Sequence, residues 1–325
     1  MAEEESQNLP VVLVLLPVRI LLMFEEQISK KFRLVKSWES SMPTPLFLST
    51  HAQSVRALLC SGRHPITSEI LGLLPSLQLI ASTSAGLNHL DLSECRQRGI
   101  AVANAGTVFS EDGADFAIGL LIDVLRRISA SDRFVRGGLW PLKGDYPLGS
   151  KLGGKRVGIV GLGNIGSEVA KRVEAFGCSI SYNSRKKKPS ILFPYYSNVC
   201  DLAANSDILI ICCALTDQTR HIINKDVMSA LGKEGVIINV GRGALIDEKE
   251  LVRCLVQGEI GGAGLDVFEN EPAVPIELFA LDNVVLSPHR AVLTPESIWA
   301  LKELMVANLE AFFSNKPLLS PVKDE

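Results

Sequence analysis

The chain has 325 residues, of which 47% are hydrophobic and 21% charged, and its formal net charge is −3. This composition is typical of a globular protein, and the length allows two domains with separate cores. Because the net charge is small, no overall field would attract nucleic acid or an anionic membrane, and small-molecule chemistry is favoured. The seven cysteines lack C-x-x-C spacing, which argues against a disulfide framework and a zinc site, so we expect no metal.

The ends of the chain carry no recognisable targeting signal. Residues 1–8 are acidic, whereas a secretory or organellar leader needs positive charge near its start. The apolar run at 11–16 is too short to span a bilayer, and residues 321–325 match neither a peroxisomal tripeptide nor a retention signal. We therefore expect a cytoplasmic protein with no membrane or nucleic-acid partner.

The first hundred residues alternate short apolar segments with helical connections. Strands are predicted at 11–16, 54–60, 77–82 and 99–104, and an amphipathic helix at 24–32. This alternation is typical of a parallel sheet covered by helices on both faces.

A loop follows the predicted strand 77–82, at the edge where open α/β sheets place their ligands. In this loop, the backbone N–H groups of Ala85 and Gly86 could bind an anion. A plain turn explains the local sequence equally well.

A long helix is predicted from Ser110, as its cap, to the residues before Gly137. Glu111 and Asp112 fall in its first turn, where the helix dipole favours negative charge. Its apolar positions form one face, made of Phe116, Leu120, Leu121 and Leu125. This face could be a dimer surface, or the helix could be a core element that connects two half-domains.

Residues 155–167 read KRVGIVGLGNIGS, a short apolar strand that runs into a glycine turn and the start of a helix. The turn matches G-x-G-x-x-G, in which the first glycine permits a sharp turn, the second lets the backbone approach a pyrophosphate, and the third allows close helix packing. The amino end of the helix would face the phosphates, so a dinucleotide is the expected ligand. The turn consists of Gly161, Leu162, Gly163, Asn164, Ile165 and Gly166.

The strand predicted at 178–183 indicates which dinucleotide binds. An NAD-selective site carries Asp or Glu near the end of this strand, but here the sequence is Asn183 followed by Ser184, Arg185 and Lys186. Without a carboxylate, and with donors able to bind a phosphate, the site favours the 2′-phosphate of NADP. A solvated basic loop or a nuclear address is the alternative interpretation.

The second half of the chain repeats the strand and helix alternation. Buried strands are predicted at 208–213, which includes Cys212 and Cys213, and at 236–240, 264–267 and 284–286. A last helix is predicted with Thr294 as its cap and Pro295 at its first position, ending near Phe313.

Three polar side chains lie just past strand ends, at the edge where the cofactor is expected. The guanidinium of Arg242 can grip a carboxylate and polarise a neighbouring carbonyl. His289 can supply the proton that a reduced ketone needs, and Glu271 would stabilise the charged imidazole. Together they predict a keto-acid reductase site, although each alone is an ordinary turn residue.

The spacing of these motifs resembles that of the D-2-hydroxyacid dehydrogenase family over nearly the whole chain. The resemblance is carried, in order, by residues 84–91 (SAGLNHLD), 99–104, 161–166, 239–243 (NVGRG), 264–272 (GLDVFENEP) and 287–289. Residues 182–185 (YNSR) favour the branch of plant NADPH-preferring glyoxylate/hydroxypyruvate reductases, with 4-hydroxyphenylpyruvate reductases as the alternative. The resemblance thus implies NADPH as preferred cofactor, with NADH possible.

The resemblance also implies roles for individual residues. Arg242 would bind the substrate, Glu271 would be the partner of the histidine, and His289 would donate the proton. The backbone of Ala85 and Gly86 would bind the substrate carboxylate, and Asp266 would hold the nicotinamide carboxamide. Ser110 and Val240 would contact the cofactor, and Trp140 would reach into the substrate pocket of the partner subunit.

The family fold would be a Rossmann dinucleotide-binding domain, residues 103–290, and a flavodoxin-like substrate domain, residues 1–102 and 291–325, in a homodimer. Three residues depart from the pattern: Arg290 stands where relatives carry a small or apolar residue, Gly106 where many have Pro, and Gly113 where they often have Val. A non-enzymatic, NAD(H)-sensing corepressor of the same fold is the alternative from another class.

Overall fold

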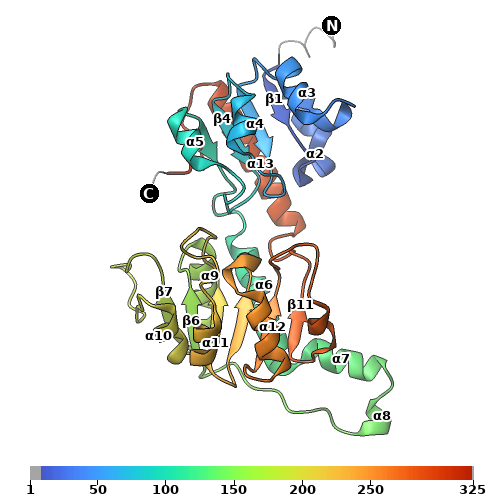
Figure 1. Ribbon diagram of the computed structural model, residues 1–325, viewed down its shortest axis with the longest axis vertical. Helices are drawn as coiled ribbons and strands as arrows, with labels where there is room; N and C mark the ends of the chain where they lie inside the picture. The colour runs from blue at the N-terminus through green and yellow to red at the C-terminus, as the bar shows by residue number, and fades with distance from the viewer. Residues whose placement is uncertain (1–8, 324–325) are drawn as a thin grey trace. The chain divides into compact units, whose positions relative to one another are not determined.

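The computed structural model describes residues 9–323, so the acidic stretch 1–8 lies outside the described residues. The chain divides into two compact units. Of the described residues, 9–109 and 294–323 form the first unit, and Ser110–Leu293 form the second (Figure 1). The divisions lie a few residues beyond positions 102 and 290, where the sequence suggested them.

The first unit contains a parallel five-stranded sheet in the order β2-β1-β3-β4-β5. Its strands are β1 (Val11–Val14), β2 (Arg33–Lys36), β3 (Ala57–Cys60), β4 (Leu79–Ser82) and β5 (Ala101–Ala103). Its helices are α2 (Arg19–Ser29), η1 (Ser37–Glu39), α3 (Thr44–His51), α4 (Ser68–Gly72), α5 (Leu92–Gln97) and α13 (Pro295–Phe313). The four predicted strands are confirmed in shorter form, whereas β2 was not predicted. The predicted helix at 24–32 corresponds to α2, which begins five residues earlier, at Arg19.

The helix α13 begins as its cap residue predicts. The hydroxyl of Thr294 accepts the amide of Ser297 at 3.0 Å, and Pro295 occupies the first helical position. α13 packs against α2 and β4, so the carboxyl-terminal segment completes the core of the first unit.

The second unit contains a parallel six-stranded sheet in the order β11-β10-β9-β8-β6-β7. Its strands are β6 (Arg156–Val160), β7 (Ser179–Asn183), β8 (Ile208–Ile211), β9 (Val236–Asn239), β10 (Gly262–Leu265) and β11 (Val284–Leu286). Its helices are α6 (Ser110–Arg126), α7 (Ile128–Arg136), α8 (Trp140–Lys143), α9 (Asn164–Ala175), α10 (Val199–Ala204), α11 (Lys225–Leu231), η2 (Gly243–Leu245), α12 (Glu248–Val256) and η3 (Ile276–Ala280).

Helices cover both faces of this second sheet, as the alternation predicts. One core includes residues of α6 and α9, and the other includes residues of α10, α11 and α12 (Figure 1). The chain leaves β6 for β7 on one side and returns to β8 on the other, so the strand order reverses between β6 and β8. Such a reversal is where open α/β sheets bind ligands. The predicted α/β fold with two parallel sheets is confirmed.

The predicted long helix is wrong in its extent, because it is two helices. α6 ends at Arg126, and Arg127 takes a left-handed conformation with φ 56° before α7 begins. The carboxylate of Asp123 accepts the amide of Ser129 at 2.8 Å, which holds the start of the second helix across the break. α6 packs on α9 and β10 as a core element of its unit.

The structure shows the surroundings of Gly106 and Gly113, the two glycines that depart from the family pattern. Gly106 adopts φ 55°, which the ring of proline forbids and which other L-residues adopt only with strain. Gly113 is buried on α6, and a Cβ there would lie 3.4 Å from Ile165 of α9 and 3.5 Å from Val292. A Cβ at this position would thus be in ordinary van der Waals contact, so the packing of α6 on α9 does not require glycine there.

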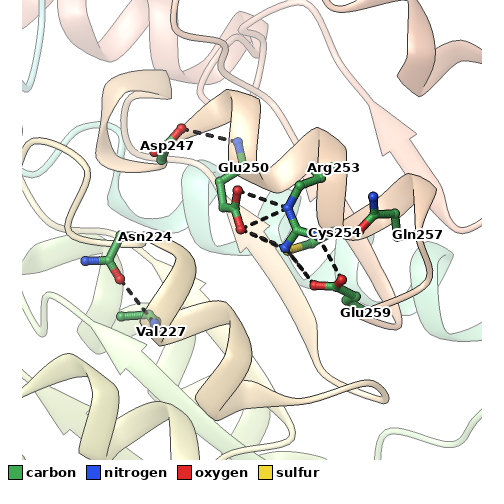
Figure 2. A network of polar contacts seen from close by, with 8 residues as sticks. All are labelled: Asn224, Val227, Asp247, Glu250, Arg253, Cys254, Gln257 and Glu259. Carbon is green, nitrogen blue, oxygen red and sulfur yellow. Dashed lines mark hydrogen bonds and ion pairs between the residues drawn. The ribbon is translucent and has the colours of Figure 1, made fainter.

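The helix α12 is tied to the turn that follows it by a network of polar contacts (Figure 2). The guanidinium of Arg253 donates to Glu250 Oε1 and to Glu259 Oε2, both at 2.7 Å. It also binds Gln257. Cys254 is buried beside them, and burial raises the pKa of its thiol to about 11, so it is an unreactive structural residue.

Between residues 9 and 323, no helix is both long and apolar enough to cross a membrane. Within the same range, no group of three or more His, Cys, Asp or Glu side chains is arranged to hold a metal ion.

Candidate active site

The glycine turn after β6 has the shape that a pyrophosphate requires. Gly161 has φ 96°, and a Cβ there would lie 2.5 Å from the backbone nitrogen of Cys213. A Cβ on Gly166 would lie 2.2 Å from the carbonyl oxygen of Gly161, so the helix can approach its strand only with glycine. By contrast, a Cβ on Gly163 would meet nothing within 4 Å. The backbone is therefore open at the second glycine, beside the amino end of α9, and fits a dinucleotide phosphate.

The neighbouring strand end corrects one sequence expectation. β8 stops at Ile211, so Cys212 and Cys213 follow the strand rather than close it, and both are half-buried. Burial raises the pKa of both thiols, that of Cys213 to about 11. Cys213 forms one wall of the glycine turn, because its backbone lies against Gly161.

The end of β7 carries a buried asparagine where NAD-selective enzymes have a carboxylate. Asn183 Nδ2 donates to the carbonyl oxygens of Tyr196 at 2.9 Å and Ser197 at 3.2 Å. The Asn183 carbonyl accepts the amide of Gly161 at 2.9 Å. Asn183 therefore connects the glycine turn to the segment after the basic loop.

The basic loop itself is exposed at Arg185 and Lys186. The hydroxyl of Ser184 donates to the carbonyl of Lys186 at 2.7 Å, so it would have to rotate to donate to a phosphate. The binding of a 2′-phosphate by this loop stays a prediction.

Arg242 is held in place by a fully buried asparagine at the end of β9. Asn239 Oδ1 accepts the amide of Gly241 at 3.0 Å, and its Nδ2 donates to the carbonyl of Arg242 at 2.9 Å. The guanidinium donates to the carbonyl of Gly241 at 2.8 Å. Burial lowers the pKa of Arg242, and the charge of Glu271 opposes this, so the group stays a cation.

The turn that carries Glu271 packs directly on the chain after Arg242. A Cβ on Gly243 would lie 1.9 Å from the carbonyl carbon of Phe268, so only glycine permits this approach. Glu271 Oε1 accepts the amide of Phe268 at 3.1 Å, which fixes the carboxylate over its own turn. The structure thus brings Arg242 and Glu271 together in the second unit.

His289 forms the third member of this group. Its Nδ1 lies 2.8 Å from Glu271 Oε2, and its backbone is left-handed with φ 53°. Burial alone would raise the pKa of Glu271, but the hydrogen bond and charge of His289, the Phe268 amide and the Arg242 charge together bring it below its usual value. The carboxylate is therefore ionised at neutral pH and can orient the imidazole through its contact with Nδ1.

Asp266 positions His289, a function that the sequence did not suggest. Its carboxylate accepts the amides of Arg290 at 2.7 Å and Ala291 at 2.9 Å, and its backbone carbonyl accepts the amide of His289 at 2.8 Å. Burial raises the pKa of Asp266, although these amide hydrogen bonds oppose the shift. Its predicted contact with a nicotinamide carboxamide stays a prediction.

A second histidine and two carboxylates surround the same turn, and sequence reasoning missed them. His221 Nε2 lies 2.8 Å from Glu269 Oε1, and the amide of Glu269 donates to Glu248 Oε2 at 2.9 Å. Burial raises the pKa of Glu248, the amide hydrogen bond opposes this, and the charges of Glu269 and Glu271 add to the rise. No motif spacing signals this group, because His221 and Glu269 come from two separate loops and Glu248 from the first turn of α12.

In the first unit, the loop after β4 is fixed through its carbonyl groups. Asn104 Nδ2 donates to the carbonyl of Ala85 at 3.0 Å, and the amide of Ala105 donates to that of Ser84 at 3.2 Å. Among the described residues, no hydrogen-bond acceptor is recorded for the amides of Ala85 and Gly86. Both amides are thus available to an anion, and their binding of a substrate carboxylate stays a prediction.

The other predicted residues lie in the second unit. Ser110 is the buried first residue of α6, Val240 is buried directly after β9, and Trp140 is exposed at the start of α8. Arg290 is exposed and contacts Asp266 through its backbone. The roles of these residues in binding stay predictions.

Comparison with known proteins identifies the class. The model of the NAD binding domain of D-isomer specific 2-hydroxyacid dehydrogenases matches residues 118–291. The glyoxylate/hydroxypyruvate reductase HPR3 of Arabidopsis thaliana is 60% identical over 320 residues, which are 98% of this chain and 99% of that protein. The hydroxyphenylpyruvate reductase of Plectranthus scutellarioides is 50% identical over 298 residues, which are 92% of this chain and 95% of that protein.

A solved structure agrees with these matches. The NADPH-dependent glyoxylate/hydroxypyruvate reductase of Sinorhizobium meliloti, in complex with NADP and malonate, superposes with a TM-score of 0.88 and 38% identity, covering 96% of each chain. The chain therefore belongs to the D-isomer specific 2-hydroxyacid dehydrogenase family. It is an NAD(P)-binding enzyme of the dehydrogenase/reductase type, as the motifs predicted.

Proposed function

We propose that this enzyme reduces hydroxypyruvate and glyoxylate to D-glycerate and glycolate with NADPH. The observation that carries the proposal is the grouping of a half-buried guanidinium, an ionised carboxylate and a histidine 2.8 Å from that carboxylate. These are the groups that a small 2-keto acid needs for binding, polarisation and protonation. The 60% identity to a plant reductase of this name supports the choice of substrate.

Each residue has a distinct task in this reaction. Arg242 binds the carboxylate and carbonyl oxygen of the keto acid and draws negative charge toward that oxygen. Glu271 binds His289 through Nδ1, which directs Nε2 to the substrate as the proton donor. Asp266 keeps the backbone of His289 in its left-handed conformation. The amides of Ala85 and Gly86 provide an anion site for the substrate carboxylate.

The dinucleotide would be held by the glycine turn at Gly161–Gly166 and by the basic loop after β7. Ser110, Val240 and Asp266 would complete the nicotinamide and ribose contacts. When bound, NADPH supplies the hydride that reduces the carbonyl carbon. The open backbone at Gly163 and the absence of a carboxylate at Asn183 support this fit, and the solved Sinorhizobium meliloti relative is described as NADPH-dependent. NADH is the alternative cofactor.

Reduction of 4-hydroxyphenylpyruvate is the second candidate, because a hydroxyphenylpyruvate reductase is 50% identical to this chain. The decisive measurement is kcat/KM of the purified enzyme for hydroxypyruvate, glyoxylate and 4-hydroxyphenylpyruvate, each with NADPH and with NADH. We expect the highest value for hydroxypyruvate or glyoxylate with NADPH. A preference for the aromatic acid would move the substrate assignment, and absence of turnover despite nucleotide binding would favour an NAD(H)-sensing, corepressor-like protein.

We also propose that the enzyme is a homodimer that pairs through the segment of α7 and α8. In Figure 1 this segment extends away from the sheet of its unit. It exposes large apolar side chains: Ile128, Val135, Trp140, Leu142 and Leu148 are 51% to 94% exposed. A second copy of the same segment would bury these side chains, and Trp140 would reach the substrate pocket of the partner.

Sedimentation velocity tests this pairing. The wild-type protein is expected to sediment as a dimer. The double variant Leu142→Ser, Leu148→Ser is expected to sediment as a folded monomer. A wild-type monomer would contradict the proposal. A cytoplasmic location, with no membrane or nucleic-acid partner, remains our expectation.

A further inference from the structure

The basic loop after β7 is anchored at both ends by tyrosine hydroxyl groups. The hydroxyl of Tyr195 donates to the carbonyl of Ser184 at 3.2 Å, where the loop begins. The hydroxyl of Tyr182 accepts the amide of Lys188 at 2.9 Å, where the loop ends. The residues between these two anchors include Arg185 and Lys186.

The position of Tyr195 is itself determined by the backbone of β7. Tyr182 and Tyr195 form a parallel bridge, in which the amide of Tyr182 donates to Pro194 and the amide of Tyr196 donates to Tyr182, both at 2.9 Å. The two tyrosine rings contact each other with centroids 5.4 Å apart, and Tyr182 is fully buried. Because its ring and backbone are both fixed, the Tyr195 hydroxyl is held at one place relative to the strand.

The loop has a physical need for such anchors. Residues 185–188 are four consecutive cations, which repel one another and have long flexible side chains. A loop that is already ordered loses less conformational entropy when it binds a ligand, so anchoring increases affinity. Only NADPH has a phosphate at the 2′ position, whereas NADH has a hydroxyl group there, so the gain would apply to NADPH alone.

We propose that Tyr195, together with Tyr182, is a positioning residue for cofactor selectivity. It holds the basic loop so that Ser184, Arg185 and Lys186 converge on the 2′-phosphate, and it contacts neither the phosphate nor the substrate. The proposal rests on the preference for NADPH given under Proposed function. It assigns part of that preference to an uncharged side chain that lies about ten positions after Arg185, in the segment that pairs with β7.

The test is to replace Tyr195 by Phe, which keeps the ring and removes only the hydroxyl. Dissociation constants for NADPH and NADH are measured by titrating the nucleotide fluorescence, without any substrate. We expect the NADPH constant to rise roughly three- to tenfold, as the loss of one hydrogen bond implies, and the NADH constant to stay within about twofold. Tyr196→Phe is the matched control, because Tyr196 contacts β7 through its backbone, and it should leave both constants unchanged.

Other outcomes would overturn the proposal. If Tyr195→Phe weakens both nucleotides equally, or neither, the tyrosine has a structural role only. If the wild type binds both nucleotides equally, the preference for NADPH is wrong and the inference fails with it. If the wild type prefers NADPH and Tyr195→Phe keeps the full preference, the inference alone is wrong. Tyr182→Phe, which removes the other anchor, must give the same selective loss and decides the question if Tyr195→Phe does not fold.

Discussion

Asp266 holds His289 through the backbone, accepting its amide at 2.8 Å, while the Asp266 carboxylate accepts the amides of the two residues that follow. This arrangement stabilises the left-handed backbone conformation of His289. Such a conformation is unfavourable for a residue other than glycine, and it is frequent at functional sites. The orientation of the imidazole toward Glu271 therefore depends on a carboxylate that does not touch the ring.

Asp266→Asn should disrupt this turn while keeping the size of the side chain. The amide group of asparagine would direct a donor at one of two backbone N–H groups, and that N–H would be left buried without an acceptor. We expect a loss of about 1–3 kcal/mol in the free energy of unfolding and a lower kcat. Denaturant unfolding and steady-state reduction of hydroxypyruvate measure these effects. Asp247→Asn is the control, because Asp247 caps α12 and asparagine caps equally well. An unchanged kcat in Asp266→Asn would contradict the positioning role.

Arg242→Lys should lower kcat/KM by roughly 100-fold, since lysine keeps the charge but loses the two-point grip on carboxylate and carbonyl oxygen. The exposed Arg220, which lies 3.9 Å from Glu269, provides a matched control in Arg220→Lys, with little expected effect. Steady-state kinetics with glyoxylate distinguishes the two variants. Near-normal turnover in Arg242→Lys would mean that charge alone is sufficient.

Glu271→Gln should change the pH dependence of stability. The pKa of Glu271 is lower in the folded protein than its unfolded value of 4.5, so its ionised form stabilises the fold above that value. This contribution is lost as pH falls through the folded pKa.

The corresponding measurement is the unfolding free energy of both proteins between neutral and acid pH. The stability difference between wild type and Glu271→Gln should shrink as pH falls below 4.5. A pH-independent difference would show that the carboxylate charge contributes nothing.

Arg185→Ala should weaken NADPH binding by about 1–3 kcal/mol and leave NADH binding nearly unchanged, because only NADPH has the 2′-phosphate. Fluorescence titration of each nucleotide provides the two constants. Lys187→Ala is the control, because it removes a charge from the same loop without removing a predicted contact. Its smaller effect on NADPH binding would measure the contribution of the loop's overall positive charge. Equal weakening of both nucleotides by Arg185→Ala would mean that the loop is only solvated.

Asn183→Asp, the substitution that would imitate an NAD-selective enzyme, should destabilise this protein instead. Asn183 donates two hydrogen bonds to backbone carbonyls, and a carboxylate would face those oxygens with no proton to donate. We expect a loss of about 2–4 kcal/mol in unfolding free energy, with no gain in NADH affinity. Thermal unfolding and NADH titration measure both. Asn224→Asp is the control at a helix cap, where either residue serves, and tighter NADH binding by Asn183→Asp would contradict the expectation.

The pattern of residues along the chain was sufficient to predict every strand of the two sheets except β2, the glycine turn, the cap of α13 and the grouping of Arg242, Glu271 and His289. These features depend on local conformation and on periodic burial, which neighbouring residues encode: Gly161 needs its left-handed turn, and Thr294 accepts an amide three residues away. The order of such motifs was sufficient to predict the family.

The way in which these residues are held follows from contacts that only the folded chain makes. Asp266 and Arg290 are 24 residues apart, and His221 and Glu269 are 48 apart, so their hydrogen bonds exist only because separate loops meet at one sheet edge. The break at Arg127, the amide of Asn183 turned toward Tyr196, and the hydroxyl of Tyr195 at the basic loop have no local signature either. Each depends on contacts between segments that are distant in sequence, and a pattern read along one chain does not contain those contacts.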